Sequence, residues 1–180
     1  MKFVDVCLTH QELENSYCKN KIVVIIDVLR ASSTINTLLY NKVKYVKPIE
    51  KLEECKKLKN HGYIIMAERL GKKVDGFDFG NSPTKINSKE FNGKKVALAT
   101  SNGTKAILKT KSSKISLIGS FLNLDIIIDY INKENSDVLL LCSGWKGSVN
   151  LEDTLCAGAI ISGLKNFQFN SDTVLMAKKL

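Results

Sequence analysis

The chain has 180 residues, of which 44% are hydrophobic and 25% charged, as is ordinary for a globular protein. The net charge of +9 suggests acidic ligands, but the lysines are scattered and form no basic run, which argues against nucleic-acid binding. The five cysteines include no CxxC pair, which argues against a disulfide framework and a structural zinc site. No signal peptide precedes the first strand-like run, and no apolar stretch approaches the ~18 residues of a membrane span. We therefore expect a cytoplasmic protein that does not enter a membrane.

Short apolar runs alternate with amphipathic segments along the chain, as in proteins whose parallel strands are covered on both faces. This alternation predicts one α/β domain over residues 1–180, a three-layer α/β/α sandwich around a largely parallel or mixed sheet. The chain stops inside a helical pattern without a cap, so we expect a piece shortened at its C-terminus. The predicted strands are Phe3–Cys7, Ile22–Val28, Val43–Val46, Tyr63–Ala67, Val96–Ala99, Ile115–Ile118 and Val138–Leu141. The predicted helices are Gln11–Cys18, Ser33–Tyr40, Lys51–Asn60, Gly103–Thr110, Leu122–Asn132, Glu152–Gly163 and Asp172–Leu180.

One segment, Arg69–Phe91, has no clear period and contains Gly71, Gly76, Gly80 and Pro83. A loop of this length inside a compact domain is usually functional or disordered. Its Gly-Phe-Asp-Phe-Gly-Asn-Ser-Pro core is too aromatic for a linker, which favours an ordered binding loop.

Polar, small-residue segments follow the ends of five apolar runs. In open α/β sheets, the carboxyl ends of the strands form one edge, and ligands bind there. We therefore expect these segments to converge on one cleft. They are Asp27–Thr34, Glu68–Pro83, Thr100–Thr104, Gly119–Asn123 and Cys142–Asp153.

Arginine is rare in this chain, and both copies lie in these polar segments. Arg30 and Arg69 are the only arginines among 27 basic residues. A guanidinium offers a planar, permanently charged fork for phosphate, carboxylate or sulfonate, so both side chains are candidates to clamp an anionic substrate. The alternative is a structural ion pair, for example between Asp27 and Arg30.

The segment Thr100–Thr104 opens a predicted helix directly after a predicted strand. Its hydroxyls and backbone N–H groups could face an anion at the positive end of the helix. A plain N-cap and tight turn would explain Ser101 and Gly103 equally well.

A cysteine and five carboxylates are the candidates for chemistry. Cys142 suggests a cysteine phosphatase, but that chemistry needs an arginine six residues later, and position 148 is serine. We therefore interpret Cys142 as a thiol in the cleft wall, with direct participation as the alternative. Asp27 and Glu68 end apolar strands, where unpaired carboxylates are costly, and Mg²⁺ takes one or two such ligands. Glu152 and Asp153 could instead satisfy a helix dipole. The carboxylates considered are Asp27, Glu68, Asp78, Glu152 and Asp153.

Taken together, these segments resemble the 2-phosphosulfolactate phosphatase family of coenzyme M biosynthesis. Six motifs match in order and span nearly the whole chain. They are Val24–Ile35, Ala67–Gly71, Gly76–Pro83, Thr100–Thr104, Gly119–Asn123, and Cys142–Gly144 continuing through Leu151–Asp153 to Cys156–Gly158.

The resemblance implies a Mg²⁺-dependent phosphatase that hydrolyses 2-phospho-3-sulfolactate. We expect a metal among Asp27, Glu68 and Asp153, in-line attack by a metal-activated water, and Glu152 or Asp153 as general acid. We also expect a homo-oligomer. The predicted catalytic residues are Asp27, Glu152, Asp153 and Cys142. The predicted substrate-binding residues are Arg30, Ser32, Ser33, Arg69, Asn81, Ser82, Thr100, Ser101, Asn102, Gly103, Thr104, Ser143 and Gly144.

Three alternatives remain open at this point. A relative could act on another phosphorylated hydroxy acid. A non-catalytic anion-binding module would keep the cleft but release no phosphate. A nucleic-acid-binding domain would show affinity that falls steeply with salt.

Overall fold

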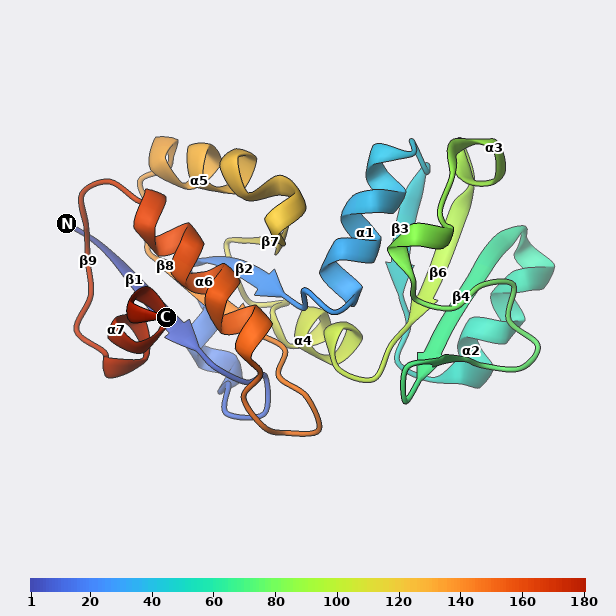
Figure 1. Cartoon of the computed structure of the whole chain (residues 1–180), viewed down its shortest axis with the longest axis horizontal. Coiled ribbons are helices and arrows are strands. Elements are labelled where there is room, and N and C mark those ends of the chain that lie inside the picture. Colours follow the sequence, from blue (N-terminus) through green and yellow to red (C-terminus); the bar gives the residue numbers. More distant parts are fainter.

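A computed structural model describes residues 1–180, apart from the side chain of Asn15. The strands form two sheets rather than one (Figure 1), of order β7-β2-β8-β1-β9 and β3-β6-β4-β5. All pairings are parallel except that of β4 with β5. The strands are β1 Lys2–Cys7, β2 Ile22–Ile26, β3 Tyr45–Pro48, β4 Tyr63–Arg69, β5 Lys72–Lys73, β6 Lys95–Ala99, β7 Ile115–Gly119, β8 Val138–Cys142 and β9 Phe167–Gln168.

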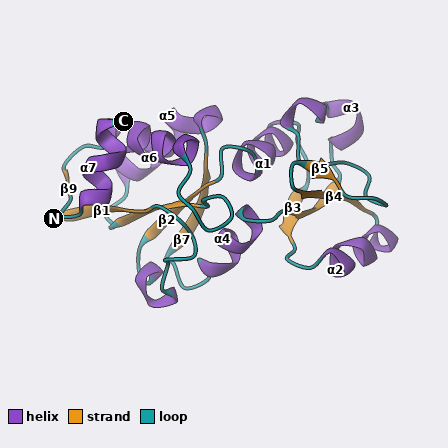
Figure 2. Ribbon diagram, turned by 60° about the horizontal axis from the view of Figure 1, so that its bottom comes forward, coloured by secondary structure: helices purple, strands orange, loops and turns teal.

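Helices cover both faces of each sheet, which confirms the predicted α/β class. In Figure 2, α5, α6 and α7 lie on one side of the five-stranded sheet and α4 on the other. The α-helices are α1 Ala31–Tyr40, α2 Leu52–Lys57, α3 Ser88–Phe91, α4 Gly103–Lys109, α5 Leu124–Lys133, α6 Leu151–Gly163 and α7 Asp172–Lys179. The 3-10 helices are η1 Asn15–Cys18, η2 Leu58–His61, η3 Pro83–Lys85 and η4 Phe121–Asn123. Among the residues described, no helix has both the length and the apolar character needed to cross a membrane.

Side-chain alternation explains why the central strands are apolar throughout. In β2, Ile22, Val24 and Ile26 pack in the cluster that contains α5, α6 and α7. The intervening Val23 and Ile25 pack on the opposite face, in the cluster that contains Ala106 of α4. Because successive side chains of a strand point to opposite faces, a strand covered on both sides must be apolar at every position.

The four-stranded sheet is inserted between β2 and β7. The chain leaves the first sheet after β2, passes through α1, builds β3 to β6 and returns through α4 (Figure 1). Its core also has two faces, one against α1 and α3 and one against α2. Ile107 of α4 and Ile118 of β7 pack against clusters of both sheets, so the two cores meet along these residues.

The predicted helix Gln11–Cys18 is largely wrong, because only Asn15–Cys18 forms a 3-10 helix. Of the side chains described there, only Leu13 and Cys18 are buried. Two buried positions supply too narrow an apolar stripe to hold a longer helix against the sheet.

The predicted loop Arg69–Phe91 is ordered, as expected, and is built mostly from turns. It contains the short strand β5, the 3-10 helix η3 and the single-turn helix α3. Phe77 is buried against the four-stranded sheet, and the Phe79 ring lies 4.9 Å from the Phe91 ring, centroid to centroid. These aromatic contacts explain how a glycine-rich segment is held in one conformation.

Contact between α6 and α7 depends on the absence of a side chain at Gly158. A Cβ atom built there would lie 1.9 Å from the carbonyl oxygen of Ala177. We expect Gly158→Ala to lower the free energy of unfolding by about 2 kcal/mol, because backbone must move to relieve the clash. Chemical denaturation measures this loss. Gly62→Ala is the comparison: its positive φ carries a backbone cost of about 1 kcal/mol, but no atom lies within 4 Å of the added Cβ, so the loss should be clearly smaller. Equal losses in the two variants would contradict the prediction.

Candidate active site

The carboxyl ends of strands from both sheets meet at one cavity of about 350 Å³. Segments that follow β2 and β8 come from the five-stranded sheet, and segments that follow β4 and β6 come from the four-stranded sheet. Four of the five predicted segments therefore converge. The lining residues are Asp27, Leu29, Arg30, Glu68, Leu70, Gly71, Asn81, Thr100, Ser101, Asn102, Gly144, Trp145, Lys146 and Asn150.

The fifth predicted segment, Gly119–Asn123, does not line this cavity. Its polar side chains face α1 instead. The Asn36 amide donates to Ser120 Oγ at 2.8 Å and to Asn123 Oδ1 at 3.1 Å. This segment therefore has a structural role in joining β7 to α1.

Asp27 follows β2 and is nearly buried at the floor of the cavity. Its Oδ1 accepts the Ala31 N–H at 3.0 Å, and its own N–H donates to Ser32 Oγ at 3.1 Å. Ser33 Oγ donates to the Val28 carbonyl at 2.8 Å, so both predicted serines form hydrogen bonds within this turn. Neither of them lines the cavity. The predicted segment therefore lines the cavity through Asp27, Leu29 and Arg30, and not through its serines.

The electrostatics of Asp27 set it apart from an ordinary helix cap. Burial, together with the nearby negative charge of Glu68, raises the pKa of its carboxyl group to about 6, although backbone N–H groups act in the opposite direction. Among the described residues, neither Asp27 nor Glu68 forms an ion pair with a lysine or arginine. The predicted alternative of an Asp27–Arg30 ion pair is therefore wrong. A perturbed carboxylate in a cleft is a frequent property of functional sites.

Asp153 holds the backbone around the cavity and does not line it. It is fully buried at the start of α6, where Oδ1 accepts the Val28 N–H at 2.8 Å and Oδ2 accepts the Ser143 N–H at 3.2 Å. Burial, followed by the charge of Asp27, raises the pKa of Asp153 to about 7. Asp153 thus joins the turns after β2 and β8, which are neighbouring strands.

The metal cluster predicted from Asp27, Glu68 and Asp153 is not assembled as a group of three. Among the residues described, no three His, Cys, Asp or Glu side chains lie close enough together to hold a metal ion. Asp27 and Glu68 line the cavity, whereas both Asp153 oxygens are bonded to backbone amides. The pair still suits Mg²⁺, which is commonly bound by one or two carboxylates together with substrate oxygens. Metal binding stays a prediction.

The segment Thr100–Thr104 is tied mainly to itself. Thr104 Oγ1 accepts the Thr100 N–H at 3.1 Å, and Thr100 Oγ1 accepts the Thr104 N–H at 3.0 Å. The Gly103 N–H donates to the Asp27 carboxyl group, so this amide is also occupied and not free for an anion. A Cβ at Gly103 would lie 2.5 Å from Asp27 Oδ2, so glycine permits this approach. Of the predicted anion donors, Thr100, Ser101 and Asn102 line the cavity.

Cys142 is the buried last residue of β8 and packs in the core. Burial raises the pKa of its thiol well above the usual range, so the nucleophilic thiolate is disfavoured. The thiol does not line the cavity, which corrects its assignment to the cleft wall. Ser143 is also fully buried, whereas Gly144 lines the cavity with φ of 66°.

Cys142→Ala is expected to keep the kcat/KM of any reaction catalysed in this cavity within about threefold of wild type, because the thiol does not line the cavity. Steady-state kinetics on a variant with a normal circular dichroism spectrum measures this. A folded variant that loses activity a hundredfold would restore Cys142 to the reaction.

Two further predicted residues lie outside the cavity. Arg69 Nη1 donates to the Glu68 carbonyl at 2.8 Å. Burial raises the pKa of Cys55, on the α2 face of the sheet, to about 11, and the charge of Arg69 opposes this rise. Glu152 accepts the Asn150 amide at 3.2 Å. Neither lines the cavity, so the structure places neither an Arg69 clamp nor a Glu152 general acid at this site.

Sequence reasoning missed several lining residues and one supporting residue. Trp145 and Lys146 lie in the predicted segment Cys142–Asp153 but were not chosen as site residues. Both are exposed at the cavity. Leu29 and Leu70 add exposed apolar surface there. Buried His10 lies outside the cavity, and its Nδ1 is 2.6 Å from the Ser143 carbonyl oxygen. No sequence signal linked His10 to this turn, because the contact joins residues 133 positions apart.

A family model described as 2-phosphosulpholactate phosphatase matches residues 7–180. The chain belongs to the 2-phosphosulfolactate phosphatase family. A probable 2-phosphosulfolactate phosphatase of Thermotoga petrophila is 44% identical over 142 residues, which are 79% of this chain and 62% of the relative. The corresponding protein of Caldanaerobacter subterraneus subsp. tengcongensis is 35% identical over 180 residues, 97% of this chain and 75% of the relative. That of Clostridium acetobutylicum is 38% identical over 162 residues, 88% of this chain and 69% of the relative.

The matches span about three fifths to three quarters of the length of these family members. The family assignment confirms the resemblance found in the sequence.

Proposed function

We propose that the chain acts as a phosphoric monoester hydrolase that converts 2-phospho-3-sulfolactate to 3-sulfolactate and phosphate. One observation carries this proposal. Segments from two sheets place the unpaired carboxylates Asp27 and Glu68 in the same cavity as the cations Arg30 and Lys146. A phosphate ester needs cations to bind its charge and carboxylates to hold a metal or move protons. Family membership supplies the substrate class.

The cationic side chains are proposed to bind and orient the substrate. Arg30 is half-buried, and its Nη2 donates to the Gly71 carbonyl at 3.2 Å, which fixes its direction across the cavity. The exposed Lys146 lies at the rim. Because phosphoryl transfer proceeds through a loose transition state, positioning and charge stabilisation supply most of the acceleration.

Asp27 and Glu68 are proposed to hold a divalent cation, most simply Mg²⁺. When bound, the cation would neutralise the transferring phosphoryl group and activate a water for in-line attack. Without it, the Asp27 carboxyl group retains a proton up to about pH 6, so cation binding must compete with protonation there. The apolar side chains of Leu29, Leu70 and Trp145 would exclude bulk water from the rim.

A phosphate-release assay tests this function directly. The substrates are the phosphate esters of 3-sulfolactate, lactate and glycerate, each with Mg²⁺ and with EDTA. We expect release that requires Mg²⁺ and is fastest with 2-phospho-3-sulfolactate. Fastest turnover of another ester would assign a different phosphorylated hydroxy acid. Binding of the esters without release would identify an anion-binding module instead.

A further inference from the structure

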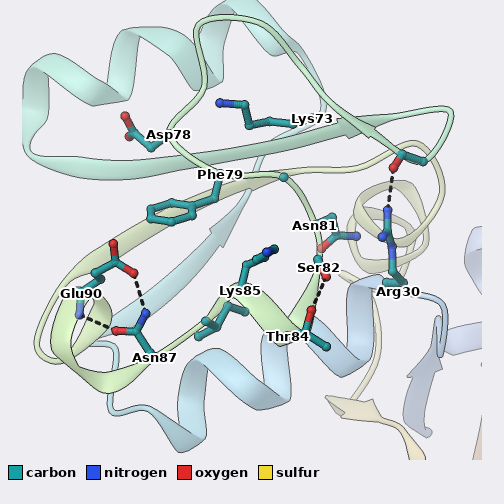
Figure 3. A pocket seen from close by; sticks show the side chains of 13 residues that line it. Arg30, Lys73, Asp78, Phe79, Asn81, Ser82, Thr84, Lys85, Asn87 and Glu90 are labelled. Carbon is teal, nitrogen blue, oxygen red and sulfur yellow. Dashed lines mark hydrogen bonds between the residues drawn. The ribbon is translucent and has the colours of Figure 1, made fainter.

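A second cavity, of about 570 Å³, adjoins the first (Figure 3). The two share Arg30, Gly71 and Asn81, so these residues lie between them and line both. The remaining wall comes from the segment between β5 and the end of α3. These residues are Lys73, Asp78, Phe79, Gly80, Ser82, Thr84, Lys85, Ile86, Asn87 and Glu90.

The charges in this wall leave a lysine without a partner. Of its two carboxylates, Asp78 is ion-paired, since its Oδ1 accepts from Lys59 Nζ at 2.6 Å, whereas Glu90 forms no ion pair and its Oε2 accepts from the Asn87 amide at 2.6 Å. Lys73 Nζ donates to the Phe77 carbonyl at 3.2 Å. Lys85 has no hydrogen bond or ion pair to any described residue, and its side chain lies between those of Phe79 and Thr84 in Figure 3.

Asn81 supplies an independent sign of a ligand. Its side chain is 2% exposed, and its Oδ1 has no hydrogen-bond partner among the described residues. The backbone of Asn81 is held in place, because its carbonyl accepts from Thr34 Oγ1 at 3.3 Å. A buried polar group without a partner is costly, and this one lines both cavities. An anion only accepts hydrogen bonds, so it would be bound by the NH₂ group, after rotation of the terminal amide brings that group toward the ligand.

The two cavities differ in the chemistry they offer. The first contains the unpaired carboxylates Asp27 and Glu68, which suit a metal and a reacting phosphoryl group. In the second, Asp78 is neutralised by Lys59, and the single charge of Glu90 faces the free ammonium group of Lys85, the ammonium group of Lys73, the shared guanidinium of Arg30 and a buried amide. These cationic groups and the amide suit a non-reacting anion that must be recognised but not cleaved.

We propose that the second cavity is the subsite for the anionic group of the substrate that lies remote from the phosphoryl group. For 2-phospho-3-sulfolactate this group is the sulfonate. Lys85 provides its charge recognition, Asn81 donates to a sulfonate oxygen, and Arg30 spans the two subsites. This inference rests on the proposed function, and it assigns specificity to a segment that takes no part in the phosphoryl chemistry.

Lys85→Gln tests the subsite with two substrates that differ only in the sulfonate. For 2-phospho-3-sulfolactate we expect KM to rise about tenfold with kcat nearly unchanged, because uniform binding is lost. For 2-phospholactate, which has no sulfonate, we expect no change in KM. Lys85→Arg should restore most of the lost affinity. The matched control is Lys89→Gln, an exposed lysine of the same segment that lines neither cavity. Equal effects of Lys85→Gln on both substrates, or no effect on either, would overturn the proposal.

Calorimetric titration with 3-sulfolactate separates this subsite from the proposed function. Binding that Lys85→Gln weakens about tenfold and Lys89→Gln leaves unchanged supports the subsite, even if the protein releases no phosphate from any ester. Equal affinity of wild type and Lys85→Gln overturns the subsite, even if phosphate release is rapid.

Discussion

Asp27→Asn is expected to lower kcat/KM for phosphate release by roughly 10³-fold or more, in proportion to the charge stabilisation that a preorganised site provides. The variant removes one of the two carboxylates that line the cavity, and with it half of the proposed cation site. The asparagine oxygen can still accept the Ala31 N–H, so this hydrogen bond at the start of α1 survives. The loss should therefore be one of chemistry and not of folding.

Steady-state kinetics at saturating Mg²⁺ measures the effect, together with thermal unfolding of the variant. The matched control is Asp129→Asn, which removes the same charge from an exposed position of α5 that lines neither cavity. We expect the control to retain full activity. Activity of folded Asp27→Asn within tenfold of wild type would remove Asp27 from the reaction.

The same substitution should change the pH dependence of stability in cation-free buffer. The pKa of Asp27 is raised from 3.8 to about 6 by burial and by Glu68, so its contribution is fully present below about pH 4 and is lost as pH rises through 6. As the pH rises from 4 to 7, wild type should therefore lose on the order of 2–3 kcal/mol of unfolding free energy that Asp27→Asn does not lose. Denaturant unfolding at several pH values measures this loss. Parallel stability profiles of the two proteins would show that Asp27 titrates normally.

Comparison with wild type also removes the other titrating groups from this measurement. Asp153, whose pKa is raised to about 7, loses stability in the same direction as Asp27. Buried His10, whose pKa is lowered by desolvation, acts in the opposite direction and loses stability as pH falls through 6.5. Both groups are present in wild type and variant, so their contributions largely cancel, apart from the charge that Asp27 exerts on Asp153.

The fold class could be predicted because burial on both faces forces β2 and β8 to be apolar throughout. The division into two sheets could not be predicted from the same information. Val23 and Val96 read alike in the sequence, yet Val23 pairs within the five-stranded sheet and Val96 within the four-stranded sheet. Apolar character reports that a strand is buried, and it does not report which strand lies beside it.

Polar residues that follow strand ends do gather at one cavity, as the sequence predicted, but the direction of each side chain was not determined by that rule. Glu68 and Arg69 are consecutive in β4, so they point to opposite faces of the strand. Glu68 reaches the cavity, and Arg69 lies on the side of α2. The alternation of side chains along a strand could therefore have shown that only one of these two residues points into the cavity. In contrast, the commitment of Asp153 to the Val28 and Ser143 amides is a long-range contact that no local pattern reveals.

Arg30→Ala is expected to lower kcat/KM for 2-phospho-3-sulfolactate by roughly 10²–10³-fold, the loss typical of a single preorganised donor. Arg30 is the one side chain with a permanent charge that lines both cavities, and the Gly71 carbonyl already holds its guanidinium in place. Arg30→Lys should lose about tenfold, since an ammonium keeps the charge and loses the two-pronged geometry. Steady-state kinetics with 2-phospho-3-sulfolactate measures both variants.

The second arginine of the chain provides the control for this prediction. Arg69 lines neither cavity, so Arg69→Lys should leave kcat and KM unchanged. Because the substitution is identical, any general effect of exchanging arginine for lysine appears in both variants, and only a contact with substrate distinguishes them. Equal kinetic losses in Arg30→Lys and Arg69→Lys would contradict the prediction, because Arg69 lines neither cavity and its loss could not come from a contact with substrate there. A loss confined to Arg30→Lys would show that this guanidinium contacts the substrate.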